Sequence, residues 1–369
     1  MRIMFCMMTL SKGGAERVVN ILSNQLSYDN EIKIVTQLNS DIAYKFNKKV
    51  IIKNLTNNTY SNNSIKKIFN KISIKSILNL KQEIINFSPD VIISFLPEPS
   101  FKVLILKKFF IKMKNIPIIV SVRNDPVIEY NNFVYKVLMK KLYKIANYLV
   151  LQTQDSKSYF DNIFTVKNSV IYNPVSTEFL VEKYTGERDK RFVAVGRLEK
   201  QKNYQLMIDA FEMFCKKFDD FILEIYGEGT FKEKIKKYIR DKNMEDKIYL
   251  KGKIDSVSDV LYKAKGFLMS SDYEGMPNSL LEAACMGVPC VSTDCPCGGP
   301  REILDNGRSG ILVPVGDVER FYEGIEEIVL NECKSEEMSK NANSNRSRYS
   351  QDIIIKEWID IIKEITKSK

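Results

Sequence analysis

Residues 266–292 read GFLMSSDYEGMPNSLLEAACMGVPCVS. The stretch begins with an apolar run at Gly266–Ser270, passes through a polar loop into a helix-forming run at Ser279–Met286, and becomes apolar again at Pro289–Ser292. Short apolar runs that alternate with helical segments are typical of parallel strands joined by crossover helices. The stretch therefore predicts one strand–helix–strand unit of a parallel sheet that helices cover on both faces.

The same alternation extends outward from this stretch. Before it, the pattern predicts three strands and two helices, at Arg191–Gly196, Phe221–Tyr226, Lys247–Leu250, Tyr204–Lys217 and Phe231–Asp241. The first half of the chain repeats the pattern, with strands predicted at Arg2–Met8, Glu31–Leu38, Val91–Phe95, Ile116–Val122 and Tyr148–Gln152 and a first helix at Gly13–Leu26. Pro174–Lys190 is polar and lacks periodicity, so we interpret it as an interdomain linker.

The length of 369 residues suits two domains, each with its own core. We expect an α/β protein with a Rossmann-like parallel-sheet domain at residues 1–175, a second one at residues 176–350, and a final helix within residues 351–369. That last segment contains the single tryptophan, Trp358.

The composition excludes several kinds of chemistry. The chain has no histidine, which rules out Ser-His-Asp and Cys-His catalysis and zinc sites built on imidazole. Its seven cysteines form no C-x-x-C pair, and Cys290, Cys295 and Cys297 lack a fourth ligand nearby, so we expect reduced thiols and no metal site. Met1–Leu10 is too short for a membrane span and lacks a signal-peptide cleavage pattern. We expect a cytoplasmic chain without transmembrane helices.

The net charge of +10 is unevenly distributed. Residues 1–180 hold 25 Lys and Arg against 12 Asp and Glu, whereas residues 181–369 hold 31 against 34. The excess lies in Ile65–Lys81, Phe101–Lys114 and Phe133–Lys144, where lysines alternate with apolar residues. Solvated helix faces are one explanation, and a basic amphipathic face on an anionic membrane is the other. Arginine is scarce in this half and no nucleic-acid motif is present, so we expect no nucleic-acid partner.

Three loops after predicted strands carry candidate binding residues. Gly13 and Gly14 lie between the first strand and the first helix, where a helix N-terminus can bind an anion. Arg197 and Lys202 follow the first strand of the second half, at an edge where open α/β sheets bind ligands. Two cations there suit a diphosphate, although two exposed surface cations would look the same in sequence.

The third loop is the most specific. Glu274 lies on the loop and Glu282 one to two helical turns beyond it, an E-x7-E spacing, with Pro277 suited to the first helical turn. The run offers backbone amides to a phosphate and carboxylates to sugar hydroxyls. The alternative is that the two residues have no binding role, with Glu274 capping the helix and Glu282 lying on its surface.

The order of these motifs resembles the family 4 glycosyltransferases, which are retaining, nucleotide-sugar-dependent enzymes of the GT-B fold. The resemblance also rests on Tyr226–Gly229, Pro289–Cys295, Gly299–Ile303 and Gly310–Pro314. Ser121–Pro126 and Tyr172–Val175 resemble bacterial members that build capsule, exopolysaccharide or lipid-linked oligosaccharide.

The resemblance implies a role for each candidate residue. The two domains would face each other across a cleft, with the acceptor on the N-terminal domain, the donor on the C-terminal domain, and the last helix packed back on the N-terminal domain. Arg197, Lys202 and Glu274 are the candidate catalytic residues. The candidate donor-binding residues are Gly13, Gly14, Gly196, Gly227, Glu228, Gly275, Met276, Pro277, Asn278, Ser279, Leu280 and Glu282. Many relatives place a histidine in the N-terminal domain near the donor sugar, and Arg123, Asn124 or Asp125 are the candidates for that region here.

The implied activity is transfer of a hexose or N-acetylhexosamine from a UDP sugar to a growing glycan, with no cofactor and no metal. The implied acceptor is linked to a polyprenyl diphosphate, which together with the basic N-terminal half suggests peripheral attachment to the inner face of the cytoplasmic membrane. A nucleotide-sugar epimerase and a non-catalytic protein that binds sugar nucleotides or membranes are the alternatives.

Overall fold

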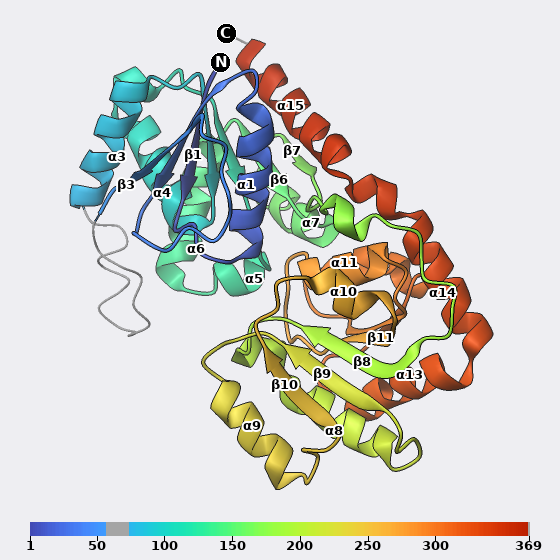
Figure 1. Ribbon diagram of the computed structural model, residues 1–369. Coiled ribbons are helices and arrows are strands. Elements are labelled where there is room, and N and C mark those ends of the chain that lie inside the picture. The colour runs from blue at the N-terminus through green and yellow to red at the C-terminus, as the bar shows by residue number, and fades with distance from the viewer. Residues whose placement is uncertain (57–73, 368–369) are drawn as a thin grey trace. The chain divides into compact units, whose positions relative to one another are not determined.

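The computed structural model describes residues 1–56 and 74–367, and its chain divides into two compact units. Unit 1 comprises Met1–Pro174 together with Ile354–Lys369, and unit 2 comprises Val175–Ile353. In each unit, helices pack on both faces of a central sheet (Figure 1).

The sheet of unit 1 contains seven strands among the described residues, all parallel, in the order β3-β2-β1-β4-β5-β6-β7. These strands are β1 Arg2–Met7, β2 Glu31–Thr36, β3 Val50–Asn54, β4 Val91–Phe95, β5 Ile118–Ser121, β6 Tyr148–Leu151 and β7 Asn168–Val170. The helices of this unit are α1 Gly14–Leu26, α3 Ile74–Phe87, α4 Pro97–Phe109, α5 Pro126–Glu129, α6 Phe133–Leu142, α7 Gln154–Asp161 and α15 Gln351–Lys367, which begins at the boundary with unit 2.

Side chains alternate between the two faces of this sheet, as the period of a strand requires. Ile3 and Phe5 belong to the core cluster that contains residues of α1 and α15, whereas Met4 and Cys6 belong to the cluster formed with α3, α4 and α6. Trp358 of α15 is fully buried and its ring stacks on that of Phe95, with 5.9 Å between the ring centroids. The last helix is therefore part of the core of unit 1.

The sheet of unit 2 contains six parallel strands, in the order β10-β9-β8-β11-β12-β13. They are β8 Asp189–Val195, β9 Ile222–Tyr226, β10 Ile248–Gly252, β11 Ala264–Met269, β12 Cys290–Thr293 and β13 Ile311–Val313. The helices are α8 Tyr204–Cys215, α9 Lys232–Asp241, α10 Val257–Tyr262, α11 Asn278–Cys285, α12 Gly299–Ile303, α13 Val318–Leu330 and α14 Glu332–Ser344. Residues of α8, α9 and α13 form one core cluster with the sheet, and α10 and α11 also contact it.

The predicted α/β class with two parallel sheets is confirmed, and most predicted elements occur within a few residues of their expected bounds. Three strands were not predicted, namely β3, β7 and β13, and each lies at a sheet edge. Edge strands are short and partly exposed, so they lack the apolar run that marks a central strand. Pro174–Lys190 is also more structured than a linker, because it contains the buried Phe179 and the first residues of β8.

Candidate functional site

The loop after β8 is held against the end of β9 by close backbone packing. Gly196 N donates a hydrogen bond to Tyr226 O at 3.0 Å, and Gly227 N donates one to Gly252 O at 2.8 Å. Gly227 has φ +146°, and a Cβ atom at this position would lie 1.8 Å from Gly196 O. Only glycine fits there, and this requirement explains the Gly227 of the sequence motif.

The loops after β8 and β11 are joined by a network of hydrogen bonds. Asn203 Nδ2 donates to Asp272 Oδ1 at 2.7 Å, and Gln201 Nε2 donates to Tyr273 O at 2.6 Å. Asp272 N donates to Gln201 O at 2.9 Å, and Ser270 Oγ donates to the Lys202 carbonyl at 2.9 Å. Strands β8 and β11 are neighbours in the sheet, which brings together two loops that lie about 70 residues apart in sequence.

Lys202 and Glu274 form an ion pair at the centre of this network. Lys202 Nζ lies 2.6 Å from Glu274 Oε1, which also accepts a hydrogen bond from Ser271 Oγ at 2.8 Å. The two side chains are 15% and 12% exposed. The sequence placed these residues in separate motifs, and the structure joins them into one mostly buried charge pair.

Arg197 differs from Lys202 in its surroundings. Its side chain is exposed, and within residues 1–56 and 74–367 its guanidinium makes no hydrogen bond or ion pair. Burial raises the pKa of the neighbouring Tyr273 phenol; Glu274 adds to this rise and Arg197 opposes it. The positive charge of Arg197 therefore reaches the Glu274 loop while the guanidinium stays available to a ligand.

Helix α11 begins beside this charge pair. Pro277 is the residue that precedes the helix and not a member of its first turn, so the expected position of this proline was wrong by one residue. The helix has no side-chain cap, and the first amides of a helix, here those of Asn278, Ser279 and Leu280, have no acceptor within it. Such a terminus carries a partial positive charge that favours an anion.

Glu282 lies within α11 and is 4% exposed. A Cβ atom on Gly299, at the start of α12, would lie 1.8 Å from Gly275 O, so α12 packs directly against the loop that contains Gly275 and Met276. Most of the predicted residues of the E-x7-E run therefore lie in one packed segment of unit 2.

The carboxylate of Glu228, a predicted donor-binding residue, is hydrogen-bonded to Lys232. Both of its carboxylate oxygens accept hydrogen bonds from Lys232 Nζ, at 2.9 and 3.2 Å, one turn further along the chain. Its carbonyl accepts from Leu198 N at 3.0 Å, which fixes the loop after β8. The structure thus gives Glu228 a role in the shape of the loop.

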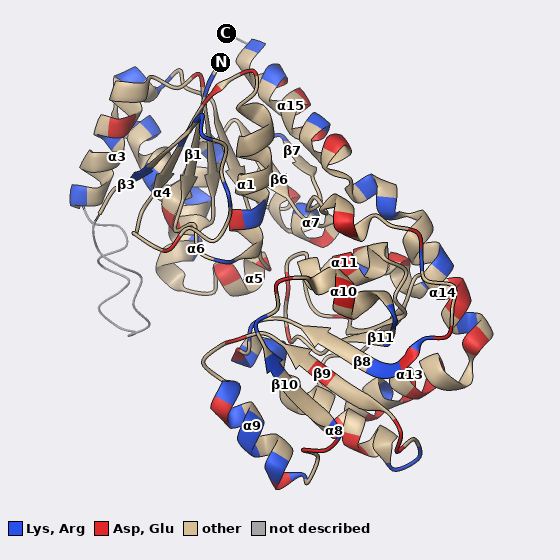
Figure 2. Ribbon diagram, in the orientation of Figure 1, with Lys and Arg blue, Asp and Glu red and all other residues tan. Residues whose placement is uncertain are grey.

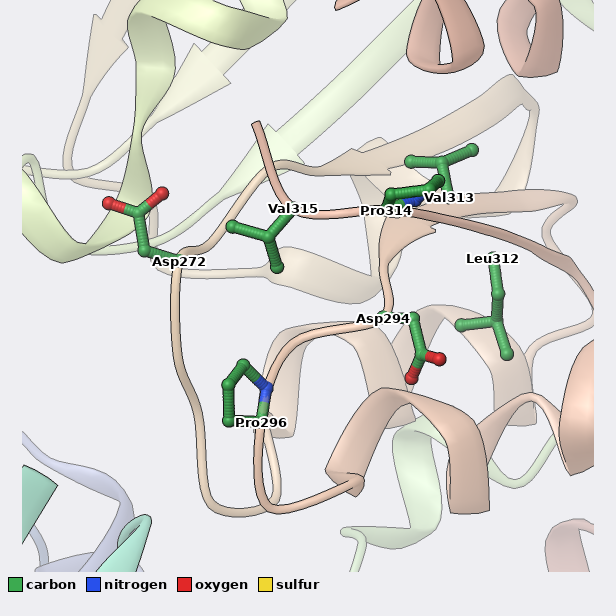
Figure 3. A pocket seen from close by; sticks show the side chains of 7 residues that line it. All are labelled: Asp272, Asp294, Pro296, Leu312, Val313, Pro314 and Val315. Atoms are coloured by element: carbon green, nitrogen blue, oxygen red, sulfur yellow. The ribbon is translucent and has the colours of Figure 1, made fainter. Parts of the chain in front are cut away.

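A pocket of about 530 Å³ opens beside the Asp272 loop. It is lined by Asp272, Asp294, Pro296, Leu312, Val313, Pro314 and Val315 (Figure 3). Asp294 Oδ2 accepts from Arg301 Nη2 at 2.9 Å. None of the lining residues was among the candidate site residues, although Asp294, Leu312, Val313 and Pro314 belong to the sequence motifs. They lie at the carboxyl ends of β11, β12 and β13, where open α/β sheets bind ligands, and this position could have predicted them as site residues.

In unit 1, the predicted glycine loop leads into α1. Gly13 precedes the helix in an extended conformation, and its carbonyl accepts a hydrogen bond from Tyr44 Oη at 2.9 Å. A Cβ atom there would lie 2.2 Å from Glu16 Oε2, the movable end of a side chain, so Gly13 is not required by the backbone. Gly14 is the first residue of α1.

Arg123, Asn124 and Asp125 follow β5. Asp125 begins α5 by accepting a hydrogen bond from Val127 N at 2.9 Å, and burial raises the pKa of its carboxyl while that bond opposes the rise. Arg123 is 9% exposed, with its guanidinium carbon 5.3 Å from the centre of the Phe95 ring. Burial lowers the pKa of Arg123 to about 9. Asn124 is half-buried.

A buried polar cluster near this loop was not predicted. Lys102 of α4 is 1% exposed and donates a hydrogen bond to Gln37 Oε1, and burial lowers its pKa to about 8. Glu98 accepts a hydrogen bond from Tyr135 Oη at 2.8 Å. Burial, with Glu98 and Asp125 nearby, raises the pKa of Glu129 to about 8. Lys102 belongs to the basic segment Phe101–Lys114, which was interpreted as an exposed helix face. Counting the charges of a segment does not show which of its lysines is buried.

All seven cysteines are free thiols, and five of them are buried. No group of three or more Cys, Asp or Glu side chains in the described part of the chain is placed to hold a metal ion. None of the described helices is both long and apolar enough to cross a membrane.

Two parallel-sheet units, with the paired loops at the carboxyl edge of the second, define the chain as a GT-B type protein. Residues 176–345 match the family described as glycosyl transferases group 1. Residues 176–345 therefore form a domain of the glycosyl transferases group 1 type, and the predicted resemblance to glycosyltransferases of this type is confirmed.

Two of the relatives that match almost the whole chain act on or build bacterial glycans, as their names state. One is N-acetylgalactosamine-N,N'-diacetylbacillosaminyl-diphospho-undecaprenol 4-alpha-N-acetylgalactosaminyltransferase of Campylobacter jejuni, 28% identical over 352 residues, or 92% of this chain and 93% of the relative. The other is the amylovoran biosynthesis glycosyltransferase AmsD of Erwinia amylovora, 28% identical over 365 residues, or 95% and 96%. Among solved structures, Anabaena HepE in complex with UDP has a TM-score of 0.81 at 15% identity and covers 99% of this chain and 100% of its own, which shows a common fold.

Proposed function

We propose that this chain is a retaining glycosyltransferase that moves a hexose or N-acetylhexosamine from a UDP sugar to a hydroxyl of a growing, lipid-linked bacterial surface glycan. The observation that carries the proposal is the joined pair of loops in unit 2, where the Lys202–Glu274 ion pair lies beside the exposed Arg197. Cations, carboxylates and helix amides are together the groups that a sugar diphosphate needs.

In this proposal the cations bind the diphosphate. Arg197 forms forked hydrogen bonds to it, and Lys202 contributes a point charge. The start of α11, where Pro277 provides no side-chain cap, adds backbone amides from Ser279 and Leu280. Glu274 accepts hydrogen bonds from hydroxyls of the donor sugar, and Glu282 accepts those of the ribose. On unit 1, the Gly13–Gly14 loop offers the N-terminus of α1 to an anion.

The proposed reaction is a front-face displacement. The bond between the anomeric carbon and the β-phosphate oxygen breaks as the acceptor oxygen attacks from the same face, so the anomeric configuration is retained. The departing phosphate oxygen takes the proton of the acceptor hydroxyl. No protein base is required, which suits a chain without histidine. Arg197 and Lys202 stabilise the charge that develops on the diphosphate.

We further propose that the reaction needs no cofactor and no metal ion, since no D-x-D run follows a strand in the sequence. The two cations would then neutralise the diphosphate by themselves. Activity that persists in excess chelator is expected. Its loss on chelation and recovery with a divalent cation would contradict this part of the proposal.

The acceptor is inferred from the relatives and from the charge of unit 1. The Campylobacter relative is named for a diphospho-undecaprenol substrate, and AmsD for amylovoran biosynthesis. Lys and Arg residues lie on several helices of unit 1, among them α3 and α15 (Figure 2). All three basic segments also expose apolar side chains among their described residues, since Ile74 is 77%, Ile111 89% and Phe133 79% exposed. Exposed apolar side chains among lysines suit the surface of an anionic membrane. Residues 65–73 of the basic segment Ile65–Lys81 lie outside the described residues.

A donor screen tests the proposal. The protein is incubated with UDP-glucose, UDP-galactose and their N-acetyl derivatives, with and without a polyprenyl-diphosphate-linked saccharide. We expect one donor to yield an elongated lipid-linked product whose new bond keeps the anomeric configuration, measured by NMR. An epimerised UDP sugar formed without acceptor would identify an epimerase instead. Donor binding without any product from this acceptor would favour a non-catalytic role.

A further inference from the structure

Arg123 is a buried cation that has no hydrogen-bond partner among the described residues. All three guanidinium nitrogens are inaccessible to solvent and make no hydrogen bond to any described residue. The Phe95 ring, which the guanidinium faces, stabilises a cation but accepts no conventional hydrogen bond. Burial lowers the pKa of Arg123, and no carboxylate of the described residues accepts a hydrogen bond from its guanidinium.

The strand registers place this side chain at the carboxyl edge of the unit 1 sheet. Phe95 of β4 pairs with Ser121 of β5, and Ser121 pairs with Val150 of β6. Arg123 and Gln152 lie two residues beyond this row on β5 and β6, where the alternation of a strand gives them the same face as Phe95. Phe95 belongs to the core cluster of α1 and α15, so Arg123 lies on the side of the sheet that these helices cover.

Other polar groups on this side are also unsatisfied. Ser121 Oγ, Gln152 Oε1 and Trp358 Nε1 are buried and lack a hydrogen-bond partner among the described residues. The Trp358 ring stacks on Phe95, the same ring that Arg123 faces. Helix α1 also packs on this face and starts from the loop after β1, the neighbour of β4. Its N-terminus therefore points toward the same edge.

Most of these groups are hydrogen-bond donors, and one carries a full charge. Water can satisfy the hydrogen bonds of a buried guanidinium, but it does not supply the opposite charge. Leaving a buried charge uncompensated is far more costly than leaving a neutral polar group unpaired. An anion with several oxygens would satisfy both the charge and the donors, and phosphoryl groups match the forked geometry of arginine.

We infer that Arg123, with Ser121 and Trp358 beside it, binds a phosphoryl group of a substrate in unit 1. The inference rests on the proposed function, which supplies two diphosphates. One belongs to the nucleotide sugar and the other to the lipid that carries the acceptor. Both present the same chemistry to Arg123, and they differ in the group attached to the diphosphate.

Binding of two soluble probes separates these sources. UDP represents the donor diphosphate and farnesyl diphosphate represents the lipid diphosphate, and each is titrated by calorimetry against the wild-type protein, Arg123→Met and Arg123→Lys. Loss of a charge-assisted contact should weaken one of the probes about 10- to 100-fold in Arg123→Met. Arg123→Lys keeps the positive charge but lacks the forked guanidinium, so its loss of affinity for the probe should be smaller than that of Arg123→Met. Weaker UDP binding assigns the site to the donor, and weaker farnesyl diphosphate binding assigns it to the lipid.

The ligand-free variant provides a second readout. Because the methionine removes an uncompensated charge and keeps most of the packing on Phe95, ligand-free Arg123→Met should melt at or above the temperature of the wild type. Wild-type affinity of Arg123→Met for both probes would overturn the inference. If Arg123→Met does not fold, wild-type affinity of Arg123→Lys for both probes would overturn it equally. None of these measurements requires turnover, so a failure to find glycosyl transfer leaves their outcome unaffected.

Discussion

The ammonium group of Lys202 lies 2.6 Å from the Glu274 carboxylate, although the two residues belong to loops that follow different strands. The pair is mostly buried, and Ser271 adds a hydrogen bond to the same carboxylate oxygen. A ligand that takes over part of the Lys202 charge also changes the environment of Glu274. Binding of a diphosphate and recognition of the sugar are therefore expected to be coupled at this pair.

Replacing Lys202 should separate its contribution to activity from its contribution to stability. Lys202→Met removes a cation from the diphosphate site and should lower the transfer rate about 10²- to 10³-fold. It also leaves Glu274 as an unpaired, mostly buried charge, so the protein should be less stable. Adding Glu274→Gln should restore stability but not activity, as measured by urea denaturation and product formation. Lys200→Met, an exposed residue of the same loop, is the control; equal losses in both lysine variants would contradict the assignment.

Arg197 should affect catalysis alone. Its guanidinium is exposed and forms no bond to any residue that the structure describes, so Arg197→Gln should change the free energy of unfolding by no more than about 0.5 kcal/mol. The transfer rate should fall about 10²-fold or more if the guanidinium binds the departing diphosphate. The measurements are steady-state kinetics and urea unfolding, with the exposed Arg240→Gln as the control. Wild-type turnover in Arg197→Gln would refute the proposed role.

Two glycines with positive φ provide a test of the backbone contact between β8 and β9. Gly227→Ala and Gly316→Ala both place a Cβ atom on a backbone that side chains rarely adopt, with φ +146° and +82°. At Gly316 nothing lies within 4 Å of the new atom, whereas at Gly227 it would lie 1.8 Å from a carbonyl oxygen. We expect Gly316→Ala to cost about 1–2 kcal/mol. Gly227→Ala should cost clearly more and also weaken UDP binding.

Urea denaturation and UDP titration of the two glycine variants would measure both effects. Equal stability of the two variants would show that the backbone at Gly227 can move away from Gly196. The shape of the loop before Arg197 would then not depend on this contact.

Glu129 should make the stability of the protein depend on pH. Its pKa is raised by burial from an ordinary value of 4.5 to about 8. Between these two values the folded state holds a proton that the unfolded state has lost, so the free energy of unfolding should fall as the pH rises from about 4.5 to 8. In Glu129→Gln the side chain stays neutral, and this part of the pH dependence should disappear.

Urea midpoints at pH 5 and pH 8 would measure the effect, with the exposed Glu187→Gln as the control. A wild-type slope in Glu129→Gln would mean that other groups, such as Asp125, are responsible for the pH dependence.

The fold was predictable because its central strands are buried on both faces. β1, β4 and the second half of β8 are apolar runs, and the segments between the strands have helical spacing or helix-forming composition. β3 and β7 lie at sheet edges, contain Lys53, Asn54 and Asn168, and are buried on one side at most. Their sequences carry no comparable signal, and only the pairing with β2 and β6 shows that they are strands.

The sequence by itself determined the class of this protein: the alternation of strands and helices, the glycines at tight turns, and the cations and carboxylates of the loops after the strands. These features are local, because each depends on residues close together in the chain. The tertiary structure decided which charges meet and which are buried. Lys202 and Glu274 lie 72 residues apart and become partners because β8 and β11 are neighbours in the sheet. The sequence does not show that Arg123 and Lys102 are buried, because burial is a property of the packed chain.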